Sequence, residues 1–319
     1  MKNSIFAFAA ALAALVACNK NEATPMQPQN QESLVPCELT VGICGAMTKA
    51  TAVSADNEAK VNNLQVFVFR GDDLDAYASV DNAQELTLSC TAGDRVVYAL
   101  VNAPDYSAVP GKAALLAKVS ELSANSLSNF EMVGSKSVTL PQSEKVSINV
   151  NRIASRVVLK KITRSFTSEA LQALNFKVDA IYLINVAGNT SYDLSAAPAK
   201  WYNVAENKNE LASLLYDAPA SLITNGQSYS TAHTFYAYPN DLATNTTRLV
   251  IETTLGETKY YYPINLPEMA ANKSYEIEEV KITRPGSDNP DEPVSFADAT
   301  FSINVIDWTV VPVTEGTTI

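Results

Sequence analysis

The octapeptide NLQVFVFR, residues 63–70, is the stretch of the sequence that most clearly indicates the fold. In an extended chain its side chains point alternately to two faces. Both faces are largely apolar, with Leu64, Val66 and Val68 on one and Gln65, Phe67 and Phe69 on the other. Strands of this kind are covered on both sides. The sequence therefore predicts a central strand here, with packing layers above and below it.

Working outward, most of the chain shows the same two-residue period. Strand patterns occur at residues 37–43, 85–90, 94–102, 132–140, 145–150, 155–162, 176–184, 234–238, 248–253, 260–264, 275–282 and 301–305. Helical patterns are sparse and cover residues 112–122, 168–174 and 210–216. Many short strands joined by polar turns favour antiparallel sandwiches. We expect an all-β protein with few short helices, built as two tandem β-sandwich domains of Greek-key or transthyretin-like type.

The boundary between these domains is expected near Arg152, which divides residues 36–152 from residues 153–319. Inside the second domain, RPGSDNPDEP at residues 284–293 has the Pro, Gly, Asp and Asn content of a linker. Its carboxylates lack the regular spacing and turn glycine of a calcium loop. Strand-quality sequence returns at residues 299–319, so the chain ends much as it begins.

The N-terminal sequence MKNSIFAFAAALAALVAC has the parts of a lipoprotein signal. Lys2 provides a positive start, and residues 5–16 are apolar but short for a membrane span. The run ends in Leu-Val-Ala-Cys, a lipobox closing at Cys18. We expect residues 1–17 to be removed, Cys18 to carry a lipid anchor, and residues 18–35 to form a polar tether. An ordinary signal peptide with a chance cysteine is the alternative.

The stretch CELTVGICGAMTKAT, residues 37–51, joins a core-quality strand to a small-residue segment that contains one basic side chain, Lys49. A protease can unfold such a segment locally. We expect cleavage between Lys49 and Ala50, which frees a first strand, residues 36–49. Its loss would uncover an apolar groove and unpaired sheet edges. A strand from another molecule could restore both, and a head-to-tail contact of this kind builds a filament.

Taken together, these features resemble the fimbrillin family, the major shaft subunits of type V pili of Gram-negative anaerobes. The resemblance rests on the order and spacing of several segments: the lipobox, the first strand with its basic residue, KVNNLQVFVF at 60–69, AGDRVVYALVN at 92–102, and ITRPG at 282–286 leading to NVIDWTVV at 304–311. It covers nearly the whole chain.

The resemblance implies a mode of assembly. In that family the precursor travels as a lipoprotein, and a trypsin-like surface protease cuts behind the first strand. The C-terminal segment of another subunit then fills the groove. The usual cut follows Arg, so Lys49 is a departure that leaves the protease unidentified. The implied partners are other copies of the chain, tip and anchor subunits and this protease, and the implied location is a surface fimbrium with a role in adhesion.

The C-terminal segment contains the candidate donor strand. Two alternating sets could face a groove: Trp308, Val310 and Pro312, or Thr309, Val311 and Val313. From these sets we select Trp308, Val310, Val311 and Val313 as candidate donor residues. The apolar positions of residues 301–305 are one residue out of phase with Trp308, which predicts a bulge near Ile306 and Asp307.

Composition argues against several other functions. The net charge of −11 argues against nucleic-acid binding. The single histidine, His233, is better explained as a structural residue, and the chain has no nucleophile elbow, P-loop, dinucleotide motif or zinc motif. We therefore expect no enzyme activity, no cofactor and no metal site, although scattered carboxylates leave a glycosidase pair open.

Three cysteines besides Cys18 leave two readings open. Cys37 and Cys44 share one predicted strand and are too far apart to pair, but one of them could pair with Cys90. We prefer three free, buried thiols that act as small hydrophobes, because a disulfide would hold the first strand in place.

A tip or accessory adhesin, or a lipid-anchored binding protein that does not polymerise, is the alternative function. The aromatic clusters at residues 235–238 and 260–262 could stack on sugars, although core packing explains them better.

Overall fold

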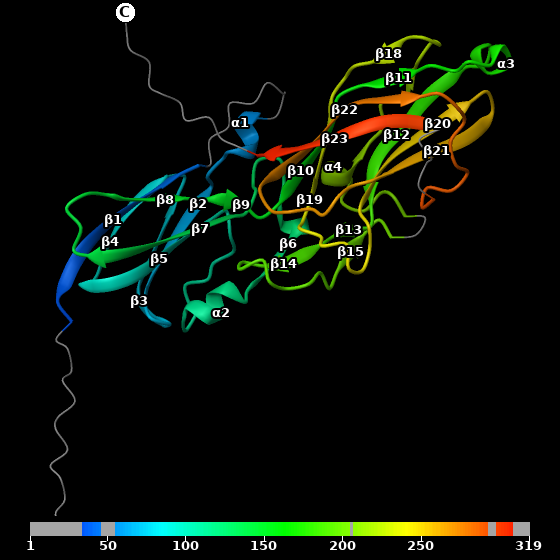
Figure 1. Cartoon of the computed structure of the whole chain (residues 1–319). Helices are drawn as coiled ribbons and strands as arrows, with labels where there is room; N and C mark the ends of the chain where they lie inside the picture. The colour runs from blue at the N-terminus through cyan, green and yellow to red at the C-terminus, as the bar shows by residue number, and fades with distance from the viewer. Residues whose placement is uncertain (1–33, 46–54, 205–206, 293–297, 309–319) are drawn as a thin grey trace, which may run out of the picture. The chain divides into compact units, whose positions relative to one another are not determined.

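The computed structural model describes residues 34–45, 55–204, 207–292 and 298–308. Strands dominate these residues, and the helices are short, so the all-β class expected from the sequence is confirmed (Figure 1). Among the described residues, no helix is both long and apolar enough to cross a bilayer.

Two sheets pack against each other in the N-terminal part. The smaller has the order β4–β1–β8, with β1 (Pro36–Cys44) between β4 (Glu85–Thr91) and β8 (Val146–Asn149). The larger has the order β3–β2–β5–β7–β9 and consists of β3 (Asp73–Asp81), β2 (Asn63–Arg70), β5 (Gly93–Val101), β7 (Met132–Leu140) and β9 (Asn151–Arg152).

The central strand β2 is covered on both faces, as its sequence predicts. Leu64, Val66 and Val68 face the smaller sheet and pack in one cluster with Leu39 and Val41 of β1. Phe67 and Phe69 lie on the other face and belong to a second, larger cluster. Sequence alternation therefore assigned these side chains to two separate cores.

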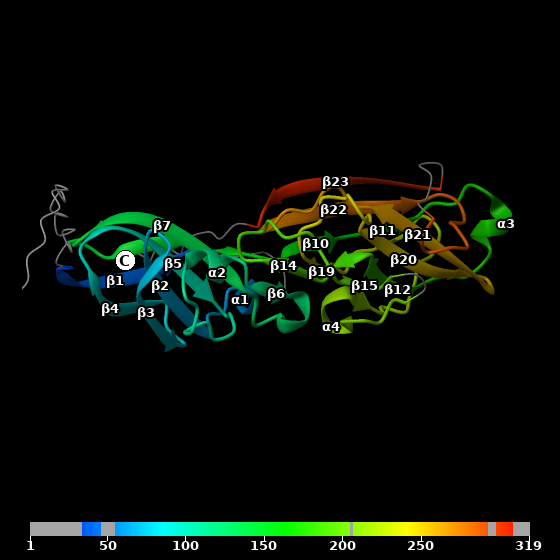
Figure 2. The same ribbon diagram turned by 90° about the horizontal axis from the view of Figure 1, so that it is seen from below.

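The C-terminal part also contains two packed sheets. In the first, β22 (Lys273–Ile282) pairs on one side with β10 (Ser155–Leu159) and β11 (Ile162–Arg164), which continue to β19 (His233–Ala237) and β18 (Ser228–Tyr229). β23 (Ala299–Asp307) pairs with β22 and lies beside it in Figure 2. The second sheet comprises β12 (Phe176–Ile184), β16 (Tyr216–Asp217), β17 (Ser221–Leu222), β20 (Arg248–Leu255) and β21 (Thr258–Asn265).

Short elements complete the fold. The helices are α1 (Ala55–Glu58), α2 (Lys112–Leu116), the 3₁₀ turn η1 (Leu122–Ala124), α3 (Glu169–Gln172) and α4 (Ala212–Leu215). Two small sheets pair β13 (Val186–Ala187) with β15 (Trp201–Tyr202), and β14 (Asn189–Ser191) with β6 (Val119–Glu121). The β14–β6 pair joins the two sides of Arg152, and residues 35–319 cluster as one compact unit. Division at Arg152 into two domains therefore stays a prediction.

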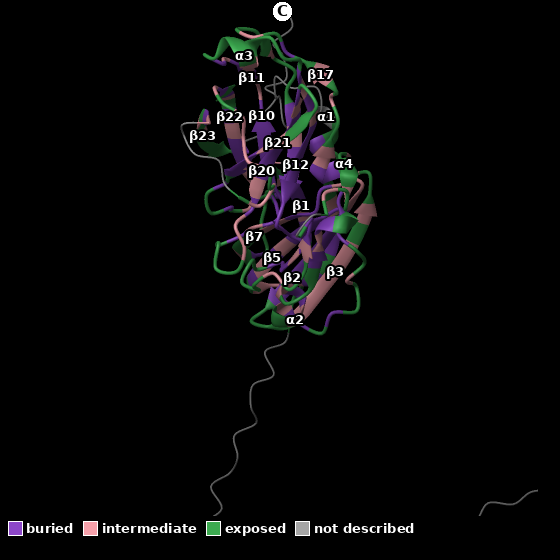
Figure 3. Ribbon diagram, turned by 90° about the vertical axis from the view of Figure 1, so that its right-hand side faces the viewer, coloured by how far each residue is buried: buried purple, intermediate pink, exposed green. Residues whose placement is uncertain are grey.

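Three local expectations are wrong. The helix expected over residues 112–122 ends at Leu116, and Val119 is exposed. β3 was not expected, and much of it has the intermediate burial colour in Figure 3. No bulge interrupts the pairing of Ile306 and Asp307 with β22; the register shift between these strands lies elsewhere, between Ile277 and Val280 of β22.

Candidate assembly site

The first strand, β1, is the middle strand of its sheet. It pairs antiparallel with β4 from Pro36–Thr91 to Gly42–Glu85, and parallel with β8 from Val41–Val146 to Cys44–Asn149. Both backbone edges of β1 are therefore used (Figure 1). If β1 left, two neighbouring strands would each be left with a free edge, with a slot between them.

The side chains of β1 alternate between the core and solvent. Leu39 and Val41 are 1% and 0% exposed. On the outer face, the hydroxyls of Thr40 and Thr87 lie 2.9 Å apart, and Ser89 donates to Glu38 at 2.7 Å. Burying two such aliphatic side chains contributes about 3–6 kcal/mol of transfer free energy. The slot beneath β1 therefore has an apolar floor and a polar rim.

The chain leaves β1 through Gly45, whose φ of +89° lies in the region that favours glycine. In the sequence, Gly45 precedes the segment that contains Lys49 and Ala50, the expected cleavage site. Both of these residues lie outside the described residues, as does Cys18.

Two of the three remaining cysteines face each other. Cys37 of β1 lies directly opposite Cys90 of β4, with the two sulfur atoms 3.7 Å apart and no disulfide between them. Burial, with the hydrogen bond from Cys37, raises the pKa of the Cys90 thiol to about 12. Cys44 is exposed at the other end of β1 and Cys37 is only partly buried, so the expectation of three buried thiols is correct for Cys90 alone.

At the other end of the chain, β23 runs along β22 from Ala299–Ile282 to Asp307–Lys273. Phe301 and Ile303 are partly buried against the core, whereas Val305 and Ile306 are half exposed. Trp308, which follows directly, is only 1% exposed. Of the four candidate donor residues, Trp308 is therefore packed inside its own chain, and Val310, Val311 and Val313 lie outside the described residues.

Trp308 belongs to a buried group that we call the Glu58–Trp308 cluster, formed with Arg152, Arg156 and Tyr236. The indole Nε1 of Trp308 and Nη1 of Arg156 donate to the Glu58 carboxylate at 3.2 and 3.1 Å, and the Tyr236 hydroxyl donates to its other oxygen. Arg152 donates to the Glu58 main-chain oxygen through Nε and Nη2, at 3.1 and 3.0 Å. Sequence reasoning selected Trp308 alone, because no local motif marks its partners.

Two guanidinium groups surround the buried Glu58 side chain in this cluster. Glu58 is fully buried, and the Arg152 and Arg156 guanidinium carbons lie 4.5 and 5.3 Å from the centre of the Trp308 ring. Burial lowers the pKa of Arg152 to about 10, although the Glu58 charge opposes this shift. Arg152 therefore remains charged at neutral pH, and the carboxylate has cationic neighbours.

His233 is held as part of the packing. Its Nδ1 lies 2.7 Å from the Asp217 carboxylate, and its ring centre is 5.5 Å from that of Tyr229. The ring itself is buried. This contact anchors β19 to β16 and gives His233 a structural role.

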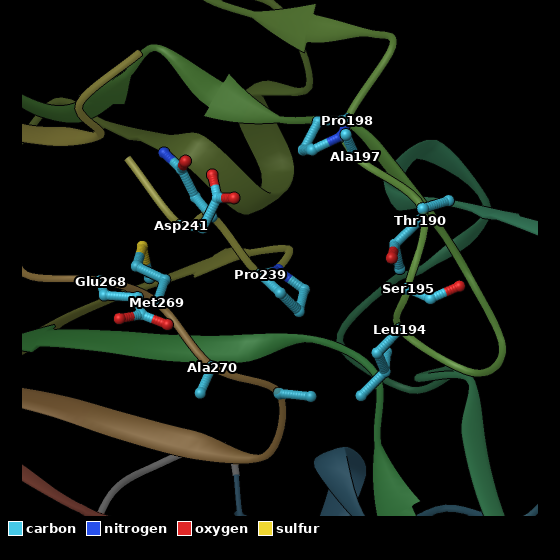
Figure 4. Close-up of a pocket in the computed structure, with 13 residues that line it drawn as sticks. Thr190, Leu194, Ser195, Ala197, Pro198, Pro239, Asp241, Glu268, Met269 and Ala270 are labelled. Carbon is cyan, nitrogen blue, oxygen red and sulfur yellow. The ribbon is translucent and has the colours of Figure 1, made fainter. Parts of the chain in front are cut away.

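A pocket of about 300 Å³ lies between residues 190–198, 239–241 and 268–271. Figure 4 shows Ser195 across the pocket from the carboxylates of Asp241 and Glu268. Its lining contains no histidine, cysteine, lysine or arginine. Across the described residues, no group of three His, Cys, Asp or Glu side chains is placed to hold a metal ion. The pocket therefore presents no recognisable catalytic set.

Solved structures share this all-β fold. A protein of Bacteroides eggerthii, provisionally described as a cell adhesion protein, matches with a TM-score of 0.68 at 21% identity, over 88% of this chain and 98% of that one. A fimbrilin (FimA) of Porphyromonas gingivalis W83 matches with a TM-score of 0.63 at 15% identity, over 86% and 98%. At these identities the likeness shows the fold alone.

Sequence comparison relates part of the chain to fimbrial subunits. Residues 38–163 match the family model of the major fimbrial subunit protein (FimA). The chain is 32% identical over 103 residues to the major fimbrium subunit FimA type-3 of Porphyromonas gingivalis, covering 32% of this chain and 25% of that protein. It thus spans about a quarter of the length of the curated relatives it matches. The resemblance to the fimbrillin family seen in the sequence is confirmed, and the family model matches it over residues 38–163.

Proposed function

We propose that this protein is a structural subunit of a cell-surface fimbrium and polymerises by strand exchange. The observation that supports this most directly is the position of β1, between β4 and β8, with Leu39 and Val41 pointing into the core. Removing an edge strand would expose one edge. Removing β1 would open a slot with two edges and an apolar floor, which an incoming strand can fill.

Export precedes assembly in this proposal. The precursor is anchored to the outer membrane through a lipid on Cys18, and a trypsin-like protease that accepts lysine cuts between Lys49 and Ala50. Releasing β1 leaves the slot open, and the C-terminal segment of a second copy enters it through Val310, Val311 or Val313. To pair with both walls as β1 does, that segment must run antiparallel to β4 and parallel to β8.

The partners follow from this head-to-tail contact. Each subunit offers a slot at one site and a donor segment at another, so the assembly grows without closing. Further copies of the chain form the shaft, and tip and anchor subunits would end it. Its role is structural and adhesive, without catalysis or a cofactor.

Limited trypsin digestion tests the proposal. We expect a stable product that begins at Ala50, followed by filaments visible by electron microscopy. Lys49→Ala should leave the fold intact and prevent filament formation. A first cut inside residues 60–150, or filaments from uncut protein, would contradict the proposal.

A truncated chain ending at Trp308 provides the matched control. It should fold, be cut and accept a donor strand, but it should supply none. Mixed with cleaved wild-type subunits, it should shorten their filaments. Long filaments of the truncated chain alone would show that residues 309–319 are not the donor.

A further inference from the structure

Trp308, immediately before the proposed donor segment, is fixed from two directions. Its indole N–H donates to Glu58, and its main-chain N–H donates to the Asn272 oxygen at 2.9 Å. The Phe130 ring meets its indole edge to face, at 5.6 Å between centroids. The side chain is thus held by residues from both the N-terminal and the C-terminal parts of the described chain.

Withdrawing this side chain would be costly. The indole would leave a cavity bounded by aromatic rings and guanidinium groups. The buried Glu58 carboxylate would also lose one of its hydrogen-bond donors. β23 adds to this attachment, because it pairs with β22 as far as Asp307. The Asp307 carboxylate forms an ion pair with Lys273 of β22.

We propose that Trp308 anchors the C-terminal end to its own subunit, so that the exchanging segment consists of residues 309–319 alone. β23 and Trp308 then keep their contacts within their own subunit during assembly. This inference rests on the proposed function and refines it, because it makes Trp308 a positioning residue and not a groove-filling one.

The length of the remaining segment is sufficient. Residues 309–319 comprise eleven residues, and β1 comprises nine. Eleven extended residues span at most about 36–40 Å, whereas a nine-residue strand spans about 30 Å. No contact of Trp308 or β23 has to break for such a segment to replace β1 in a neighbouring molecule.

The same cluster also holds the helix that follows the expected cleavage site in the sequence. Glu58 closes α1, which follows the segment that contains Lys49 and Ala50. After cleavage, Arg152 and Arg156 would still hold Glu58 in place. The new N-terminal end and the exit of the donor segment would therefore remain attached to one buried point.

A disulfide staple tests the anchor. Lys273 and Asp307 are antiparallel partners with partly exposed side chains. Such partners have Cα atoms about 4.5–5.5 Å apart, within the range of a disulfide. We would introduce Lys273→Cys and Asp307→Cys into a full chain whose native cysteines are replaced. We expect the cleaved subunits to form filaments at the same rate, within two-fold, whether the staple is oxidised or reduced.

Two outcomes overturn the inference and are distinguishable. If the reduced protein forms filaments and the oxidised protein does not, β23 must leave and the anchor is wrong. If neither form assembles while the unstapled parent also fails, strand exchange itself is wrong. A chain that keeps its native cysteines is the matched control. Oxidising its Cys37–Cys90 pair ties down β1, the strand that must leave in the proposed assembly.

Fluorescence gives an independent measurement. The chain contains two tryptophans, so Trp201→Phe leaves Trp308 as the only indole. We expect its acrylamide quenching to be the same in precursor, cleaved monomer and filament. An increase of more than two-fold in the cleaved monomer would show that Trp308 is released.

Discussion

β1 and β23 are the first and last described strands, and their environments are opposite. β1 has a partner on each side, whereas β23 pairs with β22 alone among the described strands. Leu39 and Val41 of β1 are fully buried, whereas the side chains of β23 after Ala299 are partly or fully exposed. This difference indicates which strand an incoming strand could replace with a gain in stability. Of these two strands, only β1 would leave a slot in which an incoming strand could form hydrogen bonds along both edges and bury apolar side chains.

The largest expected effect comes from oxidising Cys37 and Cys90. Their sulfur atoms are already 3.7 Å apart, so a disulfide would tie β1 to β4 after cleavage. Because burial raises the pKa of Cys90, the more exposed Cys37 should react first with a disulfide reagent such as oxidised glutathione. We expect cleaved, oxidised protein to form no filaments until a reductant is added, as judged by electron microscopy.

Cys37→Ser separates this effect from other oxidation. It should assemble equally well with and without the oxidant, while Cys44→Ser should remain fully sensitive to it. Filaments from protein whose Cys37–Cys90 bridge is verified by mass spectrometry would mean that β1 does not leave.

Trp308→Ala should produce the next largest effect. Removing a fully buried indole typically costs about 3–5 kcal/mol in the free energy of unfolding. Ile306→Ala, two residues away and 47% exposed, should cost less than about 0.5 kcal/mol. Urea denaturation of the uncut precursor measures both. Equal losses from the two variants would show that the cluster does not stabilise the chain.

Leu39→Ala sharpens the comparison because its effect should depend on cleavage. In the precursor, where Leu39 is 1% exposed, we expect a loss of about 2–5 kcal/mol. In the proposed filament β1 has been replaced, so there the variant should resist denaturant as the wild type does. Ile148→Val on β8, a wall of the slot, should weaken both forms by about 0.5–1.5 kcal/mol. A filament weakened by Leu39→Ala would indicate that β1 is retained.

Asp75→Asn tests the contact between β3 and the end of β4, and its effect should be the smallest apart from the control variants Ile306→Ala and Ile148→Val. Burial favours a higher pKa for Asp75, but hydrogen bonds from Thr91 and from the Arg95 guanidinium outweigh it and lower the pKa below 3.8. The ionised carboxylate therefore stabilises the fold above about pH 3.8, and this contribution is lost as the pH falls through the lowered value. We expect Asp75→Asn to cost about 1.5–3 kcal/mol at pH 7.

Thermal denaturation across pH checks the sign. The difference between wild type and Asp75→Asn should shrink as the pH falls below about 3.8, and it should be similar before and after cleavage. A difference that grows toward low pH would contradict this assignment.

Alternation of apolar residues determined most of the strands. The period of two reports how each face of a strand is buried, so residues 37–43 and 63–70 were predicted with the correct faces. Where the side chains of a strand are small, the contrast between its apolar and polar faces is too weak to predict it. β3 contains Ala76 and Ala78 on its inner face, and it was missed.

Helical spacing was less reliable for a related reason. Leu115 and Leu122 are both buried, as one helical face would require, but they belong to a short helix and a separate 3₁₀ turn. The exposed Val119 lies in a strand between them. Spacing alone cannot tell whether two buried residues share one element.

The sequence by itself predicted an all-β chain that resembles the fimbrillin family and has strand-like segments toward both ends, because periodicity and short motifs are local patterns. Only the tertiary structure decided that β1 is a middle strand, that Cys37 faces Cys90, and that Trp308 is bound to Glu58, 250 positions away. The physical reason is that sheet order, cross-strand register and buried charge pairing depend on partners that are distant in the sequence, and no local pattern encodes which partners meet.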